Sequence, residues 1–234
     1  MDAHRILGDR PPTDLTIIPA IEMSANVGDA EVHVLGYFID VHSAWLASRL
    51  DDLQQQRLSR IERFCTRLTS LGLPLTMAEV LDQATGASVG RPHIARAMVD
   101  RGYVNTVGEA FDRYLAGGRP AFVPREDVTP ESSIELIHGA GGAAVLAHPY
   151  TTGNPERTIE RLLPLGLDGL EVEYGYYDEL QRSFLRDLAA RFNLIPTGGS
   201  DYHGHGHREE STLGVGSVSE DIVARLQDRA ERYG

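Results

Sequence analysis

The sequence has almost no cysteine and no long apolar run. Its 234 residues contain a single cysteine, Cys65, so neither an internal disulfide nor a thiolate zinc site can form within the chain. No stretch approaches the ~18 consecutive apolar residues of a membrane span, and the first residues contain no apolar signal segment. We therefore expect a cytoplasmic protein that does not bind membranes.

Basic residues are also scarce. The chain has 22 Lys and Arg against 34 Asp and Glu, a formal net charge of −12, which disfavours binding of duplex DNA through a broad basic surface. A small phosphorylated substrate held by metal ions and a few arginines remains compatible with this charge. The length and the 41% hydrophobic content suit one large α/β domain, or a domain that carries an insertion.

Short apolar runs predict strands, and the later runs alternate with helical patterns. The runs are 15–21, 32–39, 143–147, 169–173, 194–197 and 213–218. Helical patterns cover 155–165, 177–192 and 219–232. Such alternation indicates βα units around a parallel sheet or barrel.

The block between the apolar runs at 32–39 and 143–147 has a different pattern. Apolar residues recur there at steps of three and four along one long amphipathic helix, at Leu46, Leu50, Leu53, Ile61, Phe64, Leu68 and Leu71. Three shorter helices are predicted at 77–84, 93–101 and 107–115. We therefore expect residues 45–140 to form a helical insertion subdomain within a scaffold made by residues 1–44 and 141–234.

Potential metal ligands follow or interrupt the apolar runs. They are Glu22, His33, His148, Asp201 and His203. A single histidine in such a context is most simply a hydrogen-bonded core residue. Several carboxylates and imidazoles in the same context need compensation, because burying them unpaired is costly, and a divalent metal cluster would provide it. We expect these donors at strand ends, around a common point.

The order of several motifs resembles that of a known superfamily. The motifs are Ile-Pro-Ala-Ile-Glu22-Met-Ser, His33-Val-Leu-Gly-Tyr, Gly-Arg91-Pro-His93, Ala-His148-Pro and Gly-Ser-Asp201-Tyr-His203-Gly. Together they resemble the polymerase and histidinol phosphatase (PHP) superfamily. The Gly-Arg-Pro-His segment and the helical insertion resemble its TrpH-type branch, whose members hydrolyse nucleoside 3′,5′-bisphosphates and act as 5′–3′ exoribonucleases on short RNA.

This resemblance implies a fold and a catalytic centre. The fold would be α/β, an incomplete, distorted (βα)7 PHP-type barrel with a helical insertion. Glu22 would bridge two metals, His33 and His148 would complete one of them, Asp201 would ligate a second and His203 a third. Glu22, Asp201 and His203 would thereby take part in catalysis. Carboxylate and imidazole donors suit Mn, Fe, Zn or Mg ions, and the identity of the metal stays open.

Other residues are candidates for the substrate site and its surroundings. Arg91 and His93 open a predicted helix, where the resemblance places them at the substrate phosphate; capping and packing of that helix is the alternative. Arg119 is a similar candidate, because arginine makes bidentate phosphate contacts. Glu171 and Glu173 share one strand, and we expect one of them to face the barrel mouth while the other packs against a face.

The chain also departs from the family pattern. Neither a His-x-His motif nor a Thr-Asp-His motif precedes Glu22, and Asp2-x-His4 is a weak substitute. Whether the sequence is a fragment or a natural degenerate member stays open.

We expect a metal-dependent phosphoesterase that acts on small nucleotides or short RNA. With only the position of Glu22, His33 and His148 complete, the chain as given should bind at most one metal tightly and turn over poorly. The alternatives are an inert phosphate-binding or regulatory module and, more remotely, a histidinol-phosphatase-like enzyme.

Overall fold

The chain forms two compact units. The computed structural model describes residues 16–27, 30–84, 89–124, 128–202 and 213–234. One unit consists of residues 1–46 and 128–234 and contains the β-sheet, and the other consists of residues 47–127. These boundaries differ from the expected 45–140 insertion mainly because helix α6, Pro130–Gly139, packs on the strands and so belongs to the sheet unit.

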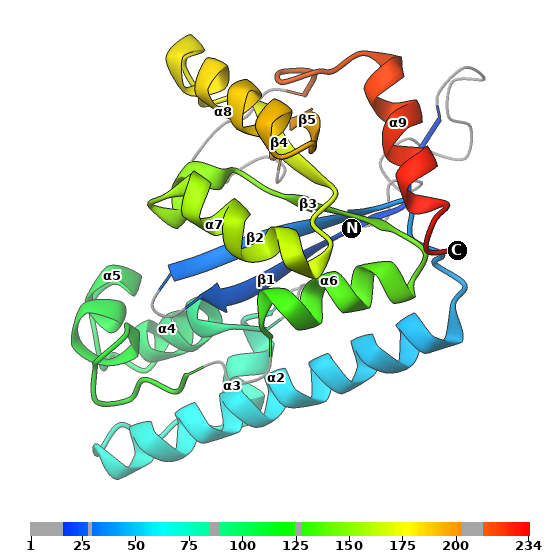
Figure 1. Ribbon diagram of the computed structural model, residues 1–234. Helices are drawn as coiled ribbons and strands as arrows, with labels where there is room; N and C mark the ends of the chain where they lie inside the picture. Colours follow the sequence, from blue (N-terminus) through cyan, green and yellow to red (C-terminus); the bar gives the residue numbers. More distant parts are fainter. Residues whose placement is uncertain (1–15, 28–29, 85–88, 125–127, 203–212) are drawn as a thin grey trace. The chain divides into compact units, whose positions relative to one another are not determined.

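The sheet unit is built on a five-stranded sheet with strand order β1-β2-β3-β4-β5. Its strands are β1 Ala20–Val27, β2 Ala30–Tyr37, β3 Ala143–Leu146, β4 Gly169–Tyr174 and β5 Ile195–Gly199. Its other helices are α7 Pro155–Leu162, α8 Glu179–Arg191 and α9 Glu220–Ala230, with 3₁₀ turns at Pro149–Thr152 and Leu163–Leu165 (Figure 1). The fold is therefore mixed α/β, and closure into a (βα)7 barrel stays a prediction.

The sheet is parallel in one half and antiparallel in the other. β3, β4 and β5 are parallel neighbours, as expected for strands that alternate with helices α7 and α8. β1 pairs antiparallel with β2, and β2 pairs antiparallel with β3. The alternation with helices concerned only the later strands, and the sequence analysis did not predict the antiparallel half. Two residues separate β1 from β2, and so short a connection can join only an antiparallel hairpin.

Two of the predicted strands were misplaced. β1 begins at Ala20, several residues after the predicted start at 15. The strand predicted at 213–218 was wrong, because residues 213–216 form turns. Gly214 and Gly216 have φ angles of 90° and 73° there, in the left-handed region that glycine adopts readily and that an extended strand does not use.

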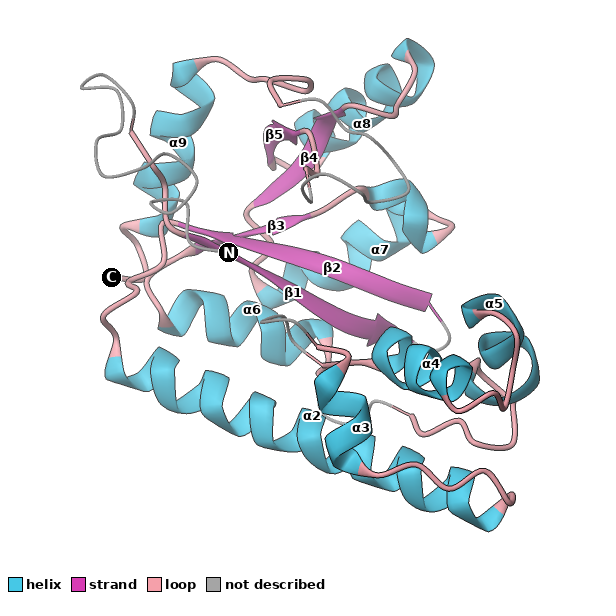
Figure 2. Cartoon of the chain, turned by 180° about the vertical axis from the view of Figure 1, so that it is seen from behind, coloured by secondary structure: helices cyan, strands magenta, loops and turns pink. Residues whose placement is uncertain are grey.

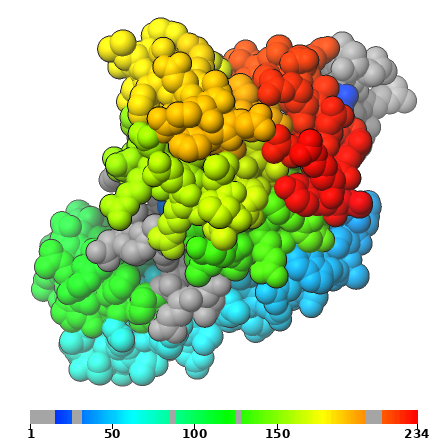
Figure 3. All heavy atoms as spheres, in the orientation of Figure 1, coloured from blue at the N-terminus to red at the C-terminus, as the bar shows by residue number. Residues whose placement is uncertain are grey.

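Helices cover both faces of the sheet. Helix α7 crosses in front of the strands in Figure 1 and behind them in Figure 2, while α6, which contacts β1 and β2, is drawn below β1 in both views. Gly36 allows α6 to approach closely, since a Cβ at this position would lie 2.7 Å from Cγ1 of Ile137. On the opposite face α9 packs against the sheet, with Leu226 of α9 in one buried cluster with Ala143 and Val145 of β3. Figure 3 shows α9 in red beside the yellow and orange segment that contains α8 and β5.

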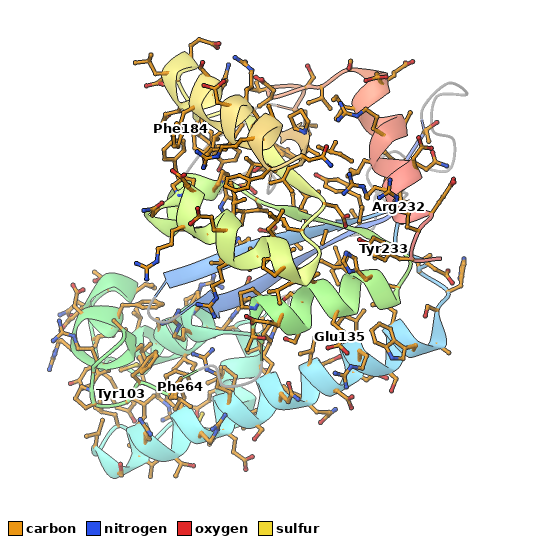
Figure 4. The ribbon with its side chains drawn as sticks, viewed as in Figure 1. Phe64, Tyr103, Glu135, Phe184, Arg232 and Tyr233 are labelled. Carbon is orange, nitrogen blue, oxygen red and sulfur yellow. The ribbon has the colours of Figure 1, made fainter. Side chains whose placement is uncertain are left out.

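A buried carboxylate links α9 to strand β3 and helix α6. Asp168 is 1% exposed. Its Oδ2 accepts a 2.9 Å hydrogen bond from the Ala144 N–H and lies 3.0 Å from Nε2 of His138. Its Oδ1 accepts a 3.0 Å bond from the Tyr233 hydroxyl and lies 3.3 Å from Nη1 of Arg229. Burial, and then Asp168, raises the pKa of Tyr233 to about 12. Figure 4 marks Tyr233 at the end of α9.

The second unit contains helices joined by turns and loops, and no strand among its described residues. Helix α2, Ala44–Ser70, runs into it, followed by α3 Met77–Asp82, α4 Arg91–Asp100 and α5 Val107–Ala110, which continues into a π-helical turn at Phe111–Leu115. The long helix predicted from apolar spacing is confirmed, and its Ile61, Phe64 and Leu68 are buried in the core of this unit. Figure 4 labels Phe64. Among the described residues, no helix combines the length and apolarity that crossing a membrane requires.

Candidate metal centre

Glu22 and His33 lie on the same side of the β1–β2 hairpin. Ser24 pairs directly with His33, and Glu22 pairs with Leu35, so Glu22 and His33 are diagonal neighbours. The expectation that these ligands sit at strand ends was wrong, since both belong to the paired strands. The antiparallel hairpin brings them together all the same, because partners on neighbouring strands project from the same face.

His148 reaches the same point from the end of β3. The N–H of Ala147 donates a 3.0 Å hydrogen bond to the carbonyl oxygen of His33, which brings the end of β3 level with His33. His148 then turns into the left-handed region, with φ 27° and ψ 60°. This turn directs the chain into the 3₁₀ segment Pro149–Thr152 and leaves the imidazole near His33.

The three side chains form a compact donor set. Oε1 of Glu22 lies 2.7 Å from Nδ1 of His33 and 3.7 Å from Nε2 of His148, and the two ring nitrogens are 3.0 Å apart. Bonds of 2.0–2.2 Å to a tetrahedral ion would separate its ligands by about 3.4 Å. Two imidazole nitrogens and one carboxylate oxygen at these separations fit a divalent metal, with His33 and Glu22 retaining 27% and 33% side-chain exposure for further ligands.

The electrostatics of the site favour a cation. The imidazoles of His148 and His33 hold the pKa of the Glu22 carboxyl well below its usual range, although burial opposes this effect. Glu171, a buried carboxyl on β4, behaves in the opposite way. Burial raises the pKa of Glu171 to about 7, and the Asp201 and Glu22 carboxylates add to the rise. A divalent ion among these carboxylates would offset their mutual repulsion.

Thr151 orients the His148 ring, and the sequence analysis missed it. Its Oγ1 lies 3.0 Å from Nδ1 of His148 and donates a 3.0 Å bond to the His148 carbonyl oxygen. That hydroxyl can then accept the Nδ1–H, which leaves the lone pair of Nε2 directed at Glu22 and His33. Such support fixes the tautomer of metal-binding histidines. The spacing His-Pro-Tyr-Thr, a tight turn with a hydroxyl three residues after the histidine, is the signal that could have revealed it.

Asp201 lies just after β5 and is held by a tyrosine. It has φ 50°, and its Oδ2 accepts a 2.9 Å hydrogen bond from the hydroxyl of Tyr174 on β4. Burial, and then Asp201, raises the pKa of Tyr174, so the phenol keeps its proton and remains a donor. His203, Asp2 and His4 lie outside the described residues. Asp201 and His203 as further ligands therefore stay predictions.

The predicted phosphate-binding residues all belong to the helical unit. Nδ1 of His93 accepts a 3.0 Å hydrogen bond from the Gly90 N–H, which caps the start of α4. Arg91 places its guanidinium carbon 5.7 Å from the centre of the Phe111 ring, and Arg119 is exposed. The capping role of His93 is thus present, and a role of Arg91, His93 and Arg119 at the substrate phosphate stays a prediction.

Comparisons with known proteins identify relatives. No family model matches the chain. A 5′–3′ exoribonuclease, Rnm, from Escherichia coli is 31% identical over 193 residues, covering 81% of this chain and 66% of that protein. A 3′,5′-nucleoside bisphosphate phosphatase from Chromobacterium violaceum is 30% identical, covering 82% of this chain and 69% of that protein. A crystal structure assigned as a metal-dependent phosphoesterase from Bifidobacterium adolescentis is 32% identical, with a TM-score of 0.70 over 91% of this chain and 76% of that one.

A mixed α/β fold with two imidazoles and a carboxylate converging on one point defines a candidate metalloenzyme. The sequence identity to the relatives shows which family of metalloenzymes is concerned. The chain belongs to the PHP superfamily of metal-dependent phosphoesterases, in its TrpH-type branch, so the resemblance drawn from the motifs is confirmed. It spans just under two thirds, 66%, of the length of the E. coli relative.

Proposed function

We propose that this protein is a metal-dependent phosphoesterase that hydrolyses nucleoside 3′,5′-bisphosphates or phosphate esters at the 5′ ends of short RNA. The observation that carries the proposal is the convergence of Glu22, His33 and His148, each of which offers one potential ligand atom within 4.8 Å of the other two. The names of the E. coli and Chromobacterium violaceum relatives support the substrate class, because both describe hydrolysis of phosphate esters of nucleotides or RNA.

The triad would hold a divalent ion, and Mn, Fe, Zn or Mg all fit the donor types to different degrees. The ion would supply a Lewis acid for a phosphoryl oxygen and help to generate the nucleophile. Glu22 contributes a carboxylate that stays ionised, His33 and His148 contribute neutral nitrogens, and we assign further ligands to Asp201 and His203.

Binding of the substrate phosphate is assigned to Arg91, His93 and Arg119 of the helical unit. Phosphate at the metal needs counter-charge on its open side, and guanidinium groups provide it with bidentate geometry. Arg91 at the first turn of α4 also has the backbone N–H groups of a helix start beside it. The insertion, residues 45–140 by sequence, would then be the part of the protein that selects the substrate.

The test is release of inorganic phosphate from adenosine 3′,5′-bisphosphate by the full chain loaded with Mn²⁺, at an enzyme concentration high enough to detect slow turnover. We expect release that stops with EDTA or with His148→Gln. Glu173→Gln, which changes a carboxylate paired with Arg186 of α8, should keep the activity. Arg91→Gln should raise KM more than it lowers kcat.

Two results would contradict this proposal. Phosphate release that survives His148→Gln would remove the triad from the reaction. A wild-type chain that binds Mn²⁺ and releases no phosphate would instead favour an inert phosphate-binding module.

A further inference from the structure

The backbone of His148 is held in a conformation that needs support. Its φ of 27° and ψ of 60° lie in the left-handed region, which side-chain-bearing residues adopt at a cost. Pro149 follows, and a residue before proline ordinarily prefers extended backbone. Since the direction of the imidazole depends on this backbone, whatever stabilises the turn also sets the position of Nε2.

Glu171 supplies that support. Its Oε2 accepts a 2.7 Å hydrogen bond from the backbone N–H of His148, and both residues are buried, at 4% and 8% exposure. The absence of a side chain at Gly199 makes room for this carboxyl, because a Cβ there would lie 2.9 Å from Oε1 of Glu171. A buried N–H left without an acceptor would be costly, so the bond favours the observed turn.

An irregularity in β4 lies between Glu171 and Glu173 and separates the directions of their side chains. Glu171 pairs with Thr197 and Glu173 with Gly198, so two steps along β4 match one step along β5. This is a β-bulge with one extra residue. In a regular strand Glu171 and Glu173 would share a face. With the bulge, Glu171 contacts His148, whereas Glu173 is paired with Arg186 of α8.

The bulge has a second consequence for the same face. Tyr174 lies three residues after Glu171, an odd spacing that a regular strand would divide between two faces. In the bulged strand, Glu171 bonds His148 and Tyr174 bonds Asp201. One strand thus contacts a residue at the end of β3 and a residue after β5, on the two neighbouring strands.

We propose that Glu171 is a positioning residue of the metal centre: its carboxyl, which accepts the His148 N–H from the neighbouring strand β4, fixes the His148 backbone so that Nε2 lies beside Glu22 and His33. This inference rests on the proposed metal site. It assigns to Glu171 neither metal ligation nor a proton transfer, and the required property is a hydrogen-bond acceptor at the position of Oε2.

The test compares Co²⁺ binding by the full-length wild type, Glu171→Met and Glu171→Gln. Methionine has similar length and no comparable acceptor, whereas glutamine retains one. We expect Glu171→Met to weaken Co²⁺ binding by about 10–100-fold, as for loss of other outer-shell partners, and to change the visible absorption bands that report coordination geometry. Glu171→Gln should stay within about fivefold of the wild type and keep its spectrum, since its amide oxygen can accept the His148 N–H.

Glu173→Gln is the matched control, because it changes the other carboxyl of β4 on the α8 side and should leave Co²⁺ binding unchanged. Urea unfolding in EDTA verifies that each variant is folded at the titration temperature. If Glu171→Met does not fold, Gly199→Ala, which crowds Oε1 of Glu171, should weaken Co²⁺ binding as well.

The outcomes separate the two proposals. The role of Glu171 is overturned if Glu171→Met binds Co²⁺ with the affinity and the absorption spectrum of the wild type. The same result in Gly199→Ala overturns it if that variant is used. The metal site is unaffected by either result. Equal weakening by methionine and glutamine also overturns it, because the acceptor would then not be the required property. No Co²⁺ binding by the wild type overturns the metal site and, with it, the role of Glu171.

Discussion

Glu171 should give the metal-free protein an unusual dependence on pH. Burial raises its pKa from an ordinary 4.5 to about 7 in the folded chain. Between these values the unfolded chain has released a proton that the folded chain still holds, so the free energy of unfolding falls as pH rises. Glu22 has the opposite sign, since its pKa is lowered, and it acts only as pH falls below about 4.5.

We predict that the advantage in stability of wild type over Glu171→Gln declines between pH 4.5 and 7.5, by on the order of 3 kcal/mol. Urea unfolding in EDTA at a series of pH values measures this difference. The glutamine variant has no titrating group at this position, so it is the reference against which the stability of the wild type is compared at each pH. A difference that stays constant over this range would show that the folded carboxyl titrates normally.

At the scale of elements, the contact between β2 and α6 is tight at Gly36. A Cβ there would lie 2.7 Å from Ile137 and 3.1 Å from Ile21, so one of the packed elements must shift. We predict that Gly36→Ala lowers the free energy of unfolding by about 1–3 kcal/mol, the usual cost of overpacking. Gly117→Ala is the control, because nothing lies within 4 Å of its Cβ, and it should change stability by less than about 0.5 kcal/mol. Equal effects of the two variants would mean that α6 has room to move.

The attachment of α9 depends on Asp168. Loss of its carboxylate leaves the buried N–H of Ala144 and the partly buried donors of Arg229 and Tyr233 without this acceptor. We predict that Asp168→Ala lowers the free energy of unfolding by about 3–5 kcal/mol. Asp228→Ala, which removes an exposed carboxylate from α9, should be nearly neutral. Hydrogen exchange of α9 amides should accelerate in the first variant alone, and unchanged exchange there would contradict the role of Asp168.

For the molecule as a whole, the sequence was most informative where polar residues interrupt apolar runs. Glu22, His33 and His148 stood out for that reason, and the structure brings them together. The antiparallel hairpin was not predicted, because the apolar run at 15–21 led to a predicted first strand that begins and ends earlier than β1 does. Helix α6 was missed because its apolar positions fell inside a block interpreted as an insertion. The bulge in β4 leaves no signal in composition, since it depends on pairing with β5.

The central claim is that the triad of Glu22, His33 and His148 binds a divalent metal. Equilibrium dialysis of the full chain against Zn²⁺ or Mn²⁺, followed by elemental analysis, tests it most directly. We predict that one bound equivalent depends on the triad. Glu22→Gln should weaken its binding by more than the ~10–100-fold typical of an outer-shell partner, while Glu173→Gln keeps it. Metal content that is the same in wild type, Glu22→Gln and His148→Gln would contradict the claim.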